Sequence, residues 1–380
     1  MELAGSLGDL GTMLPLLIPM IVINGLNATM TMLLVGLFYV CAGLYYKIPV
    51  PVQPLKAVAI IAIAGRLPAQ AIVAAGLIMG IILLFFAATG LINQVARVFS
   101  KPVVRGVQVA LGLLLFISGV RYVIDSKLFL SGETASVGAL PINLVVGAAG
   151  FLIVGLLLTN RKIPAAIVLL IFGAMVGLLF KSPSITLGPQ VSSPQVPTMT
   201  DLQMALVLLV VPQVGLTIFN AAIATSDLAK KYYGKKGAKA SPRALTGSMA
   251  AANLAAGALG GMPMCHGGGG LVAHHRFGAR TGGSNLIIGG IFITMALLFG
   301  AGAVSVFGLI PLSILGVLLI VTGLELIILA VDVKDKRDFL VVSVIAGLAV
   351  ATNNMTAAAL TGIVLYYILK WHAPRRILWT

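Results

Sequence analysis

The sequence contains little charge. Only 9% of its 380 residues are Asp, Glu, Lys or Arg, whereas 59% are hydrophobic. Soluble globular chains carry about 25% charged and about 45–50% apolar residues, so a soluble fold is excluded. The mean hydropathy of +1.09 indicates a chain that lies mostly in lipid.

Acidic residues are the scarcest of the charged ones. The chain has 10 Asp and Glu against 25 Lys and Arg, which gives a formal net charge of +15. Nucleic-acid binding would require these basic residues to gather on one face of a soluble fold. Because the composition leaves no room for such a fold, we expect no nucleic-acid partner.

Cysteine is also rare, and the start of the chain lacks basic residues. Cys41 and Cys265 cannot build a disulfide framework, so the sequence does not determine the redox compartment. Residues 1–9 contain Glu2 and Asp9 but no positively charged n-region of the kind that opens a secretory signal peptide. We therefore expect the first apolar segment to be retained.

Long apolar runs fill the rest of the chain. A transmembrane helix needs about 20 apolar residues, and the runs between charges, prolines and glycines predict fourteen segments, of which the third and the tenth are too short to span as straight helices. The segments lie near 7–24, 28–46, 52–65, 68–92, 103–122, 140–159, 163–180, 202–227, 243–259, 264–275, 283–301, 309–331, 338–353 and 355–371.

The distribution of Lys and Arg supports this count, because basic residues collect in cytoplasmic loops. Four of them fall in one set of alternate loops: Arg66, Arg121, Lys127 and Lys181. Lys56 lies inside a segment, and the others fall in the opposite set: Lys47, Arg97, Lys101, Arg105, Arg161, Lys162, Lys230, Lys231, Lys235, Lys236, Lys239, Arg243, Arg276, Arg280, Lys334, Lys336, Arg337, Lys370, Arg375 and Arg376. We therefore predict a multi-pass protein of the cell membrane with both termini in the cytoplasm.

The two halves of the chain correspond to each other. Residues 112–119 align with 316–323 at an offset of 204, and the short stretch 51–53 aligns with 263–265 at an offset of 212. Seven crossings per half is an odd number, so the second half would enter the membrane from the opposite face. This pattern predicts an inverted-topology repeat, which is typical of alternating-access transporters.

The third and tenth segments are both interrupted. Prolines at 49, 51 and 54 favour an extended stretch, with Pro54 suited to the first turn of a following helix. In the tenth segment, four glycines at 267–270 would allow a ligand to approach the backbone closely; close helix packing is the alternative. Two short helices that begin in mid-membrane would direct free N–H groups toward each other and form an anion site.

Charged residues inside the membrane are hypotheses of function by default. We expect Lys56 to add a positive charge to the anion site, or else to form a structural ion pair with Asp9. Asp9 precedes Thr12 in a polar break, and it would either bind or relay a proton or hold the broken end of the first segment. Asp227 and Glu325 are interpreted as interface anchors.

At these residues the chain resembles the molybdate transporter family, a branch of the sulfate permease superfamily. The resemblance covers nearly the whole chain, although Gly215 and Phe219 depart from the family pattern. The stretches that carry it are Pro49-Val50-Pro51-Val52-Gln53-Pro54-Leu55-Lys56-Ala57, Gly261-Met262-Pro263-Met264-Cys265-His266-Gly267, Gly8-Asp9-Leu10-Gly11, Pro212-Gln213 with Asn220-Ala221, and Arg276-Phe277-Gly278-Ala279-Arg280-Thr281-Gly282-Gly283.

The resemblance implies an all-α polytopic membrane protein with a seven-plus-seven inverted repeat. Its core domain would comprise 1–92 and 202–301, and its gate domain 93–201 and 302–380. Substrate would bind between the short discontinuous helices of segments three and ten. The expected substrate-binding residues are Gln53, Pro54, Lys56, Thr217, Asn220, Cys265, His266, Gly267 and Gly268, with Asp9 and Thr12 in coupling or structural roles.

We therefore predict a secondary active transporter of a tetrahedral oxyanion, with molybdate first and sulfate or tungstate as the alternatives. The sequence leaves an anion channel of the same fold as an alternative. It also leaves undecided whether protons are the coupling ion and whether the protein forms a homodimer. A nucleobase permease would be expected to carry an acidic residue in segment eight or ten, where Asn220 and Cys265 stand. An enzyme is not expected, because the side chains of the adjacent Cys265 and His266 diverge. No cofactor or resident metal is expected.

Overall fold

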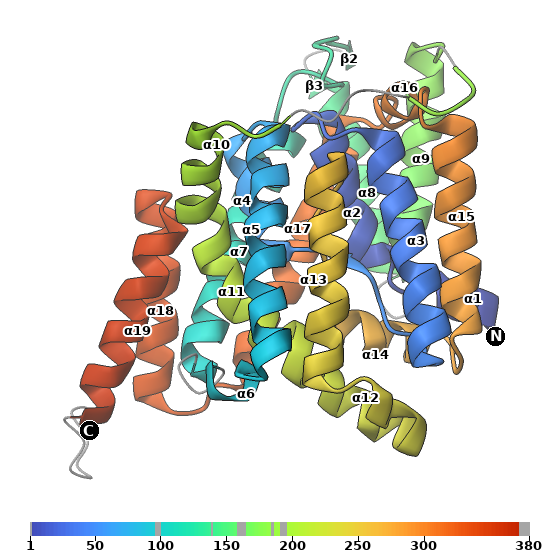
Figure 1. The fold of residues 1–380 in the computed structure, drawn as a ribbon. Helices are drawn as coiled ribbons and strands as arrows, with labels where there is room; N and C mark the ends of the chain where they lie inside the picture. The colour runs from blue at the N-terminus through green and yellow to red at the C-terminus, as the bar shows by residue number, and fades with distance from the viewer. Residues whose placement is uncertain are drawn as a thin grey trace.

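The computed structural model describes residues 2–95, 100–137, 140–157, 165–183, 186–190 and 196–371. Most of its long helices run side by side along one direction (Figure 1), which satisfies the backbone hydrogen bonds of a chain in lipid. The all-α polytopic fold class is confirmed. Five basic residues that the sequence assigns to loops lie outside the described residues: Arg97, Arg161, Lys162, Arg375 and Arg376.

The first half of the chain holds nine helices and three very short strands among its described residues. They are α1 (Glu2–Ser6), α2 (Leu10–Val22), α3 (Ala28–Tyr46), β1 (Gln53–Pro54), α4 (Lys56–Gly65), α5 (Ala69–Thr89), α6 (Ile92–Val95), α7 (Lys101–Val123), β2 (Ser136–Val137), β3 (Leu140–Pro141), α8 (Ile142–Leu157) and α9 (Ala165–Phe180).

The second half opens on a long helical run that includes two π-helical segments, η1 and η2. Its described elements are α10 (Met199–Met204), η1 (Ala205–Val210), α11 (Val211–Leu216), η2 (Thr217–Ala224), α12 (Thr225–Tyr233), η3 (Gly234–Lys239), α13 (Pro242–Leu259), β4 (Met264–Cys265), α14 (Gly268–Arg276), α15 (Gly283–Phe299), α16 (Ala303–Phe307), α17 (Leu312–Ile328), η4 (Leu329–Asp332), α18 (Lys336–Thr352) and α19 (Met355–Trp371).

Helix length and composition agree with a membrane protein. Five described helical runs are long and apolar enough to span: Ala28–Tyr46, Ala69–Thr89, Lys101–Val123, Met199–Lys239 and Leu312–Asp332. Six shorter helices of 10–17 residues are also apolar: Leu10–Val22, Lys56–Gly65, Ile142–Leu157, Ala165–Phe180, Gly283–Phe299 and Met355–Trp371. The count of fourteen crossings stays a prediction.

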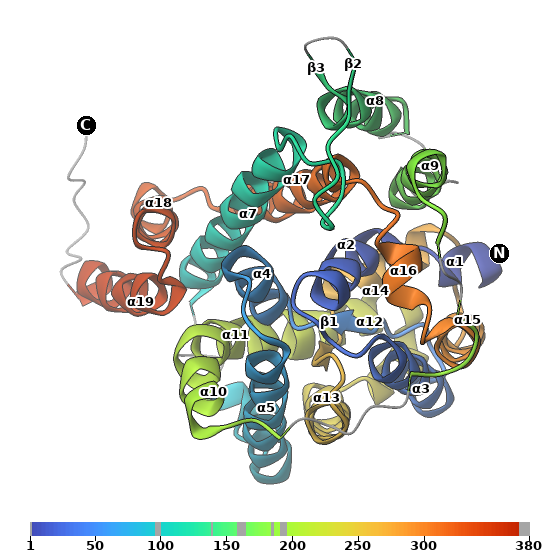
Figure 2. The same cartoon turned by 90° about the horizontal axis from the view of Figure 1, so that it is seen from above.

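The helices pack as an inverted repeat requires. Helix α3 packs against α15, and their repeat counterparts α13 and α5 pack against each other, while α7 packs against its own counterpart α17. A pseudo-twofold axis that exchanges the halves would map each of these pairs onto another or onto itself. Seen from above, α7 and α17 lie between α18 with α19 on one side and α8 with α9 on the other (Figure 2).

Four glycines bring α7 and α17 into close contact. A Cβ added to Gly112 would lie 2.6 Å from the carbonyl oxygen of Gly323, and one added to Gly119 would lie 2.5 Å from that of Gly316. The sequence repeat equates Gly112 with Gly316 and Gly119 with Gly323, so each contact is the symmetry mate of the other. Small residues allow the two backbones to approach closely, as in other membrane helix pairs.

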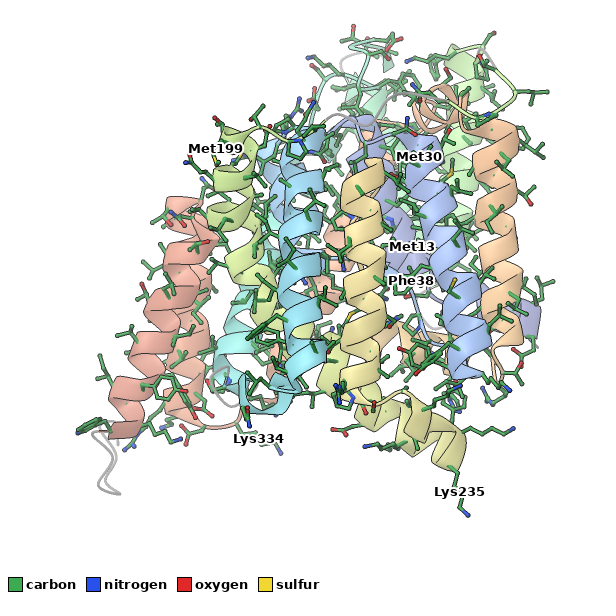
Figure 3. All side chains as sticks on the ribbon, in the orientation of Figure 1. Met13, Met30, Phe38, Met199, Lys235 and Lys334 are labelled. Carbon is green, nitrogen blue, oxygen red and sulfur yellow. The ribbon has the colours of Figure 1, made fainter. Side chains whose placement is uncertain are left out.

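The two ends of the molecule differ in charge. Lys235 and Lys334 lie at the lower end in Figure 3, and Met199 lies at the upper end. Helix α19 ends on the lower side, whereas the chain leaves α7 for the β2–β3 hairpin on the upper side (Figure 1). This arrangement agrees with the predicted placement of the basic loops on one side.

Candidate functional site

The two interrupted stretches meet as an antiparallel strand pair. Gln53 pairs with Cys265 and Pro54 with Met264. Helices α4 and α14 begin just after these strands, and they lead away toward opposite ends of the molecule (Figure 1). Pro54 therefore lies in a strand and not in the first helical turn, and Lys56 is the first residue of α4.

A buried glutamine caps the beginning of α4. The Oε1 atom of Gln213 accepts hydrogen bonds from the backbone N–H groups of Ala57 at 2.8 Å and Val58 at 3.4 Å. Its Nε2 atom donates to the hydroxyl of Thr217 at 2.8 Å. These N–H groups are therefore occupied, and the side chain of Lys56 is what α4 offers to an anion. From the sequence, Gln213 was one of the residues that carry the family resemblance, but it was not predicted as a site residue.

The beginning of α14 has no side-chain cap. A Cβ added to Gly267 would overlap the Oε1 atom of Gln53, and one added to Gly270 would lie 2.7 Å from the Oδ2 atom of Asp9. A Cβ on Gly268 would come within 3.1 Å of Leu228, whereas nothing lies within 4 Å at Gly269. Three of the four glycines thus make room for neighbouring side chains.

Asp9 and Gln53 form a fully buried polar pair. The Nε2 atom of Gln53 donates to the Oδ1 atom of Asp9 at 2.5 Å, and the two residues are 0% and 1% exposed, respectively. The backbone N–H of Thr12 donates to the carbonyl oxygen of Asp9 at 3.0 Å. Asp9 therefore joins the start of α2 to strand β1, and no ion pair with Lys56 forms among the described residues.

His266 has partners on both ring nitrogens. Its Nδ1 lies 2.8 Å from the carbonyl oxygen of Pro51, and its Nε2 lies 2.8 Å from the hydroxyl of Ser248. Its ring centroid is 4.8 Å from that of Phe38, which Figure 3 labels near the middle height of the molecule. The imidazole therefore connects the two interrupted stretches and has no nitrogen available to a ligand in this conformation.

Beside the strand pair lies a small polar pocket. Its volume is about 10 Å³, which is room for one water molecule at most. Its lining joins elements of both halves: Lys56, Gln108, Leu111, Gln213, Leu216, Thr217, Asn220, Ala221, Cys265 and Leu326. The structure thus brings together Lys56, Thr217, Asn220 and Cys265 from the predicted set, and it adds the amides Gln108 and Gln213.

A larger cavity of about 370 Å³ adjoins this pocket and shares Lys56 and Leu326 with it. Its walls come from α2, α4, α8, α9, α14 and α17, and Thr12 and Glu325 line it. Arg276 and Leu329 also line it, near the lower ends of α14 and α17. The cavity therefore extends from Lys56 toward the lysine-rich lower end of the molecule.

Two further histidines among the described residues, His274 and His275, contact different partners. The Nδ1 atom of His274 lies 2.7 Å from the carbonyl oxygen of Gly5, and the ring of His275 stacks on that of Tyr232 with centroids 4.4 Å apart. Within the part of the chain that the structure describes, no three His, Cys, Asp or Glu side chains gather closely enough to hold a metal ion.

The sequence is similar to a known protein family over the ranges that contain the two interrupted stretches. A family model described as "Molybdate transporter of MFS superfamily" matches residues 1–115 and 205–326. The chain belongs to this family. The matched ranges include both strands and both short helices around Lys56.

Similar proteins from plants and algae extend over nearly the whole chain. "Molybdate transporter 2" of Arabidopsis thaliana is 28% identical over 97% of this chain and 87% of its own length. "Molybdate transporter 1" of the same plant is 27% identical over 97% of this chain and 88% of its own length. "Molybdate transporter 1" of Chlamydomonas reinhardtii is 27% identical over 96% of this chain and 90% of its own length. These relatives are named as transporters and not as enzymes.

Solved structures show the same fold. The transmembrane domain of a cyanobacterial bicarbonate transporter, BicA, matches with a TM-score of 0.63 at 16% identity, over 97% of this chain and 96% of that one. The murine anion transporter Slc26a9 in its inward-facing state matches with a TM-score of 0.69 at 15% identity, over 97% of this chain and 68% of that one. The protein is thus a membrane-embedded, multi-pass member of a transporter family with this architecture.

Proposed function

We propose that this protein is a secondary active transporter that moves a tetrahedral oxyanion, molybdate first, across the cell membrane. Sulfate and tungstate are the alternatives. The observation that carries the proposal is the position of Lys56, which begins α4 and lines both the small polar pocket and the large cavity. Membership of the molybdate transporter family supports the choice of molybdate.

The polar pocket has the chemistry of an oxyanion site. Lys56 supplies a positive charge, the amides Gln108, Gln213 and Asn220 supply N–H donors, and Thr217 supplies a hydroxyl. Charge-assisted hydrogen bonds of this kind are stronger than neutral ones. A dianion placed in an apolar membrane interior without such groups would be prohibitively unstable.

The small volume of this pocket supports alternating access. At about 10 Å³ the pocket holds at most one water, so an oxyanion with four oxygens needs the walls to separate. Gln108 on α7 and Leu326 on α17 face Lys56 and Cys265 across it. We place these walls in the gate (93–201 and 302–380) and the core (1–92 and 202–301), respectively, so that sliding of one against the other opens the site.

The large cavity supports a proposal about the side to which the site is open. It reaches from Lys56 toward Arg276 at the lower end, and we assign that end to the cytoplasm because Lys235 and Lys334 lie there (Figure 3). The structure then corresponds to an inward-facing state, with both termini in the cytoplasm. A second copy of the chain in a homodimer is compatible with this assignment.

Uptake by proteoliposomes tests the proposal. The purified protein should accumulate radiolabelled molybdate, and unlabelled tungstate or sulfate should compete in the order of their affinities. Uptake should rise when an inward proton gradient is imposed and fall when it is collapsed. Uptake of labelled bicarbonate without uptake of molybdate would reject the tetrahedral-oxyanion assignment, and unitary currents in planar bilayers would show a channel instead of a transporter.

A further inference from the structure

Glu325 faces the cavity that leads to Lys56. It lies on α17, whereas Lys56 lies on α4, and both side chains line the same space of about 370 Å³. Glu325 is exposed to that space and Lys56 is half-buried. The sequence alone suggested that Glu325 is an interface anchor, but its position makes it the acidic residue of the cavity.

Three charged groups lie near one another here. Lys56 and Glu325 line the cavity together, and Asp9 is buried next to Gly8, which also lines it. Asp9 is engaged with Gln53. Among the described residues, neither the Lys56 nor the Glu325 side chain has a hydrogen bond or an ion pair, so both side chains are available to a ligand or to each other.

Other charges near α17 are engaged elsewhere or lie farther along the cavity. Arg276 lines the cavity on α14. Arg105 on α7 holds Asp332 through its Nη2 and Nε atoms at 2.7 and 2.9 Å, and Arg121 belongs to the opposite end of α7. Helices α8 and α9, which also pack near α17, contribute no titratable side chain between 142 and 157 or between 165 and 180.

The charge balance of this cavity changes when an anion enters. The charged side chains that line it are Lys56, Arg276 and Glu325, which carry one net positive charge when Glu325 is ionised. A divalent oxyanion at Lys56 would turn this into one net negative charge and place a second negative group opposite the Glu325 carboxylate. Like charges in a medium of low dielectric constant repel strongly. A proton bound to Glu325 removes one of these charges and leaves Lys56 free to pair with the anion.

We propose that Glu325 is the proton site that couples oxyanion movement to the proton gradient. In the empty transporter the carboxylate is attracted to Lys56 across the cavity, and proton binding releases Lys56 for the substrate. The proton leaves again when the anion has been released and the Glu325 carboxylate recovers its attraction to Lys56. This inference rests on the proposed function, because it names the coupling group of the same site.

Glu325→Gln tests the inference, since glutamine keeps the shape of the side chain but cannot exchange a proton. In proteoliposomes the variant should lose accumulation of molybdate driven by a proton gradient, by tenfold or more. Its exchange of internal for external molybdate, which needs no net proton movement, should stay within about twofold of the wild-type rate. Glu325→Asp retains an ionisable group and should retain gradient-driven uptake.

Asp227→Asn is the matched control, because Asp227 is an exposed carboxylate on α12 that does not line the cavity. It should behave as the wild type. Gradient-driven uptake that survives in Glu325→Gln would overturn the inference, and so would the loss of exchange in a Glu325→Gln protein that elutes as a single folded species.

A measurement without substrate separates this inference from the proposed function. Infrared difference spectra recorded on acidification should contain a protonated-carboxyl band that is missing in Glu325→Gln and present in Asp227→Asn. An unchanged band in Glu325→Gln would reject Glu325 as a proton site whatever the substrate. Absence of any molybdate uptake by the wild type, with this band still assigned to Glu325, would reject only the oxyanion proposal.

Discussion

At the scale of single residues, Lys56 occupies a position that is unfavourable twice over. A lysine in the membrane interior costs about 2.5–3.5 kcal/mol on insertion scales. As the first residue of α4, it also places a positive charge at the positive end of the helix dipole. The half-buried side chain lines two cavities and has no ion pair among the described residues, so its charge remains available to an anion.

Replacement of Lys56 by alanine should weaken molybdate binding by about 1.5–3 kcal/mol, the usual contribution of a hydrogen bond to a charged group. Calorimetric titration in detergent would measure it. Lys127→Ala, on the upper loop, should bind as the wild type does. If Lys56→Ala instead unfolds and Asp9→Asn rescues it, the lysine has the structural ion-pair role that the sequence left open.

The sequence predicted part of the polar pocket and missed the rest for an identifiable reason. Lys56 and Cys265 lie in the two interrupted stretches, so their meeting follows from the repeat. Gln213 and Gln108 lie within helical runs, where the sequence predicts a helix–helix hydrogen bond as readily as a pocket-lining role for a polar residue. Whether such an amide caps α4 or lines a pocket depends on which helix is its neighbour, and the sequence does not contain that information locally.

At the scale of elements, the glycines that begin α14 have different neighbours. Gly267 lies against the buried amide of Gln53, whereas nothing lies within 4 Å of a Cβ on Gly269. The close approach of Gly267 is therefore structural, because Gln53 is held by Asp9. Substitution at 267 should accordingly disturb the protein itself.

Gly267→Ala should lower the free energy of unfolding by about 1–3 kcal/mol, the usual cost of overpacking a filled interior. Gly269→Ala adds the same methyl group two residues further along and should leave stability equal or higher by about 0.5–1 kcal/mol, since alanine favours a helix over glycine. Thermal unfolding in detergent compares the two. Equal melting temperatures would show that Gln53 moves aside freely.

A loop element at the upper end offers a pH-dependent contact. Lys181, which follows α9, lies 2.8 Å from the Oε1 atom of Glu133, and the hydroxyl of Ser131 donates to the Oε2 atom at 2.5 Å. The hydrogen bond from Lys181, followed by that from Ser131, lowers the pKa of Glu133 from 4.5 to about 2. The ionised carboxylate thus stabilises the fold above pH 4.5, and this contribution disappears as the pH falls from about 4.5 to 2.

Glu133→Gln should therefore be less stable than the wild type at pH 6 and equally stable near pH 2. The difference should be under about 1 kcal/mol, because exposed ion pairs are screened by water, and 1 M salt should reduce it further. Paired melting curves across this range measure the difference. A difference that is constant with pH would assign the effect to packing and not to the charge.

The elements themselves were predictable to different degrees. Prolines and glycines mark the two interrupted stretches, so the short helices α4 and α14 follow from the sequence. The π-helical segments η1 and η2 on either side of Gln213 do not. A π turn adds a residue to a helix without any local signal, is stabilised by tertiary contacts, and occurs frequently at functional sites.

At the scale of the whole molecule, the arrangement of the halves distinguishes between two kinds of transporter. The family model is described as part of the MFS superfamily, whose two halves are parallel repeats. Here β1 pairs antiparallel with β4, and Gly112 and Gly119 meet Gly323 and Gly316 in the opposite order. This architecture instead matches BicA and Slc26a9. The glycine spacing alone did not contain this information, because Gly112 and Gly119 could meet their counterparts in either order. The odd number of predicted crossings per half is what indicated the antiparallel arrangement.

The inverted repeat leads to a prediction about sidedness. Arg121 lies in the last turn of α7 and Glu325 near the lower end of α17, two residues beyond the equivalent Gly119 and Gly323. Single cysteines at 121 and 325, with Cys41 and Cys265 replaced, should react with an impermeant maleimide from opposite sides of the membrane: 121 from outside and 325 from the cytoplasm.

Molybdate should slow the reaction at 325, which lies in the cavity, and leave the reaction at 121 unchanged. A cysteine at Lys235 should react from the cytoplasmic side in every case and reports the orientation of the vesicles. Reaction of 121 and 325 from the same side would contradict the inverted repeat together with the alternating-access mechanism. Reaction from opposite sides without protection by molybdate would retain the fold but place the substrate away from Glu325, because an anion held at Lys56 shares one cavity with residue 325.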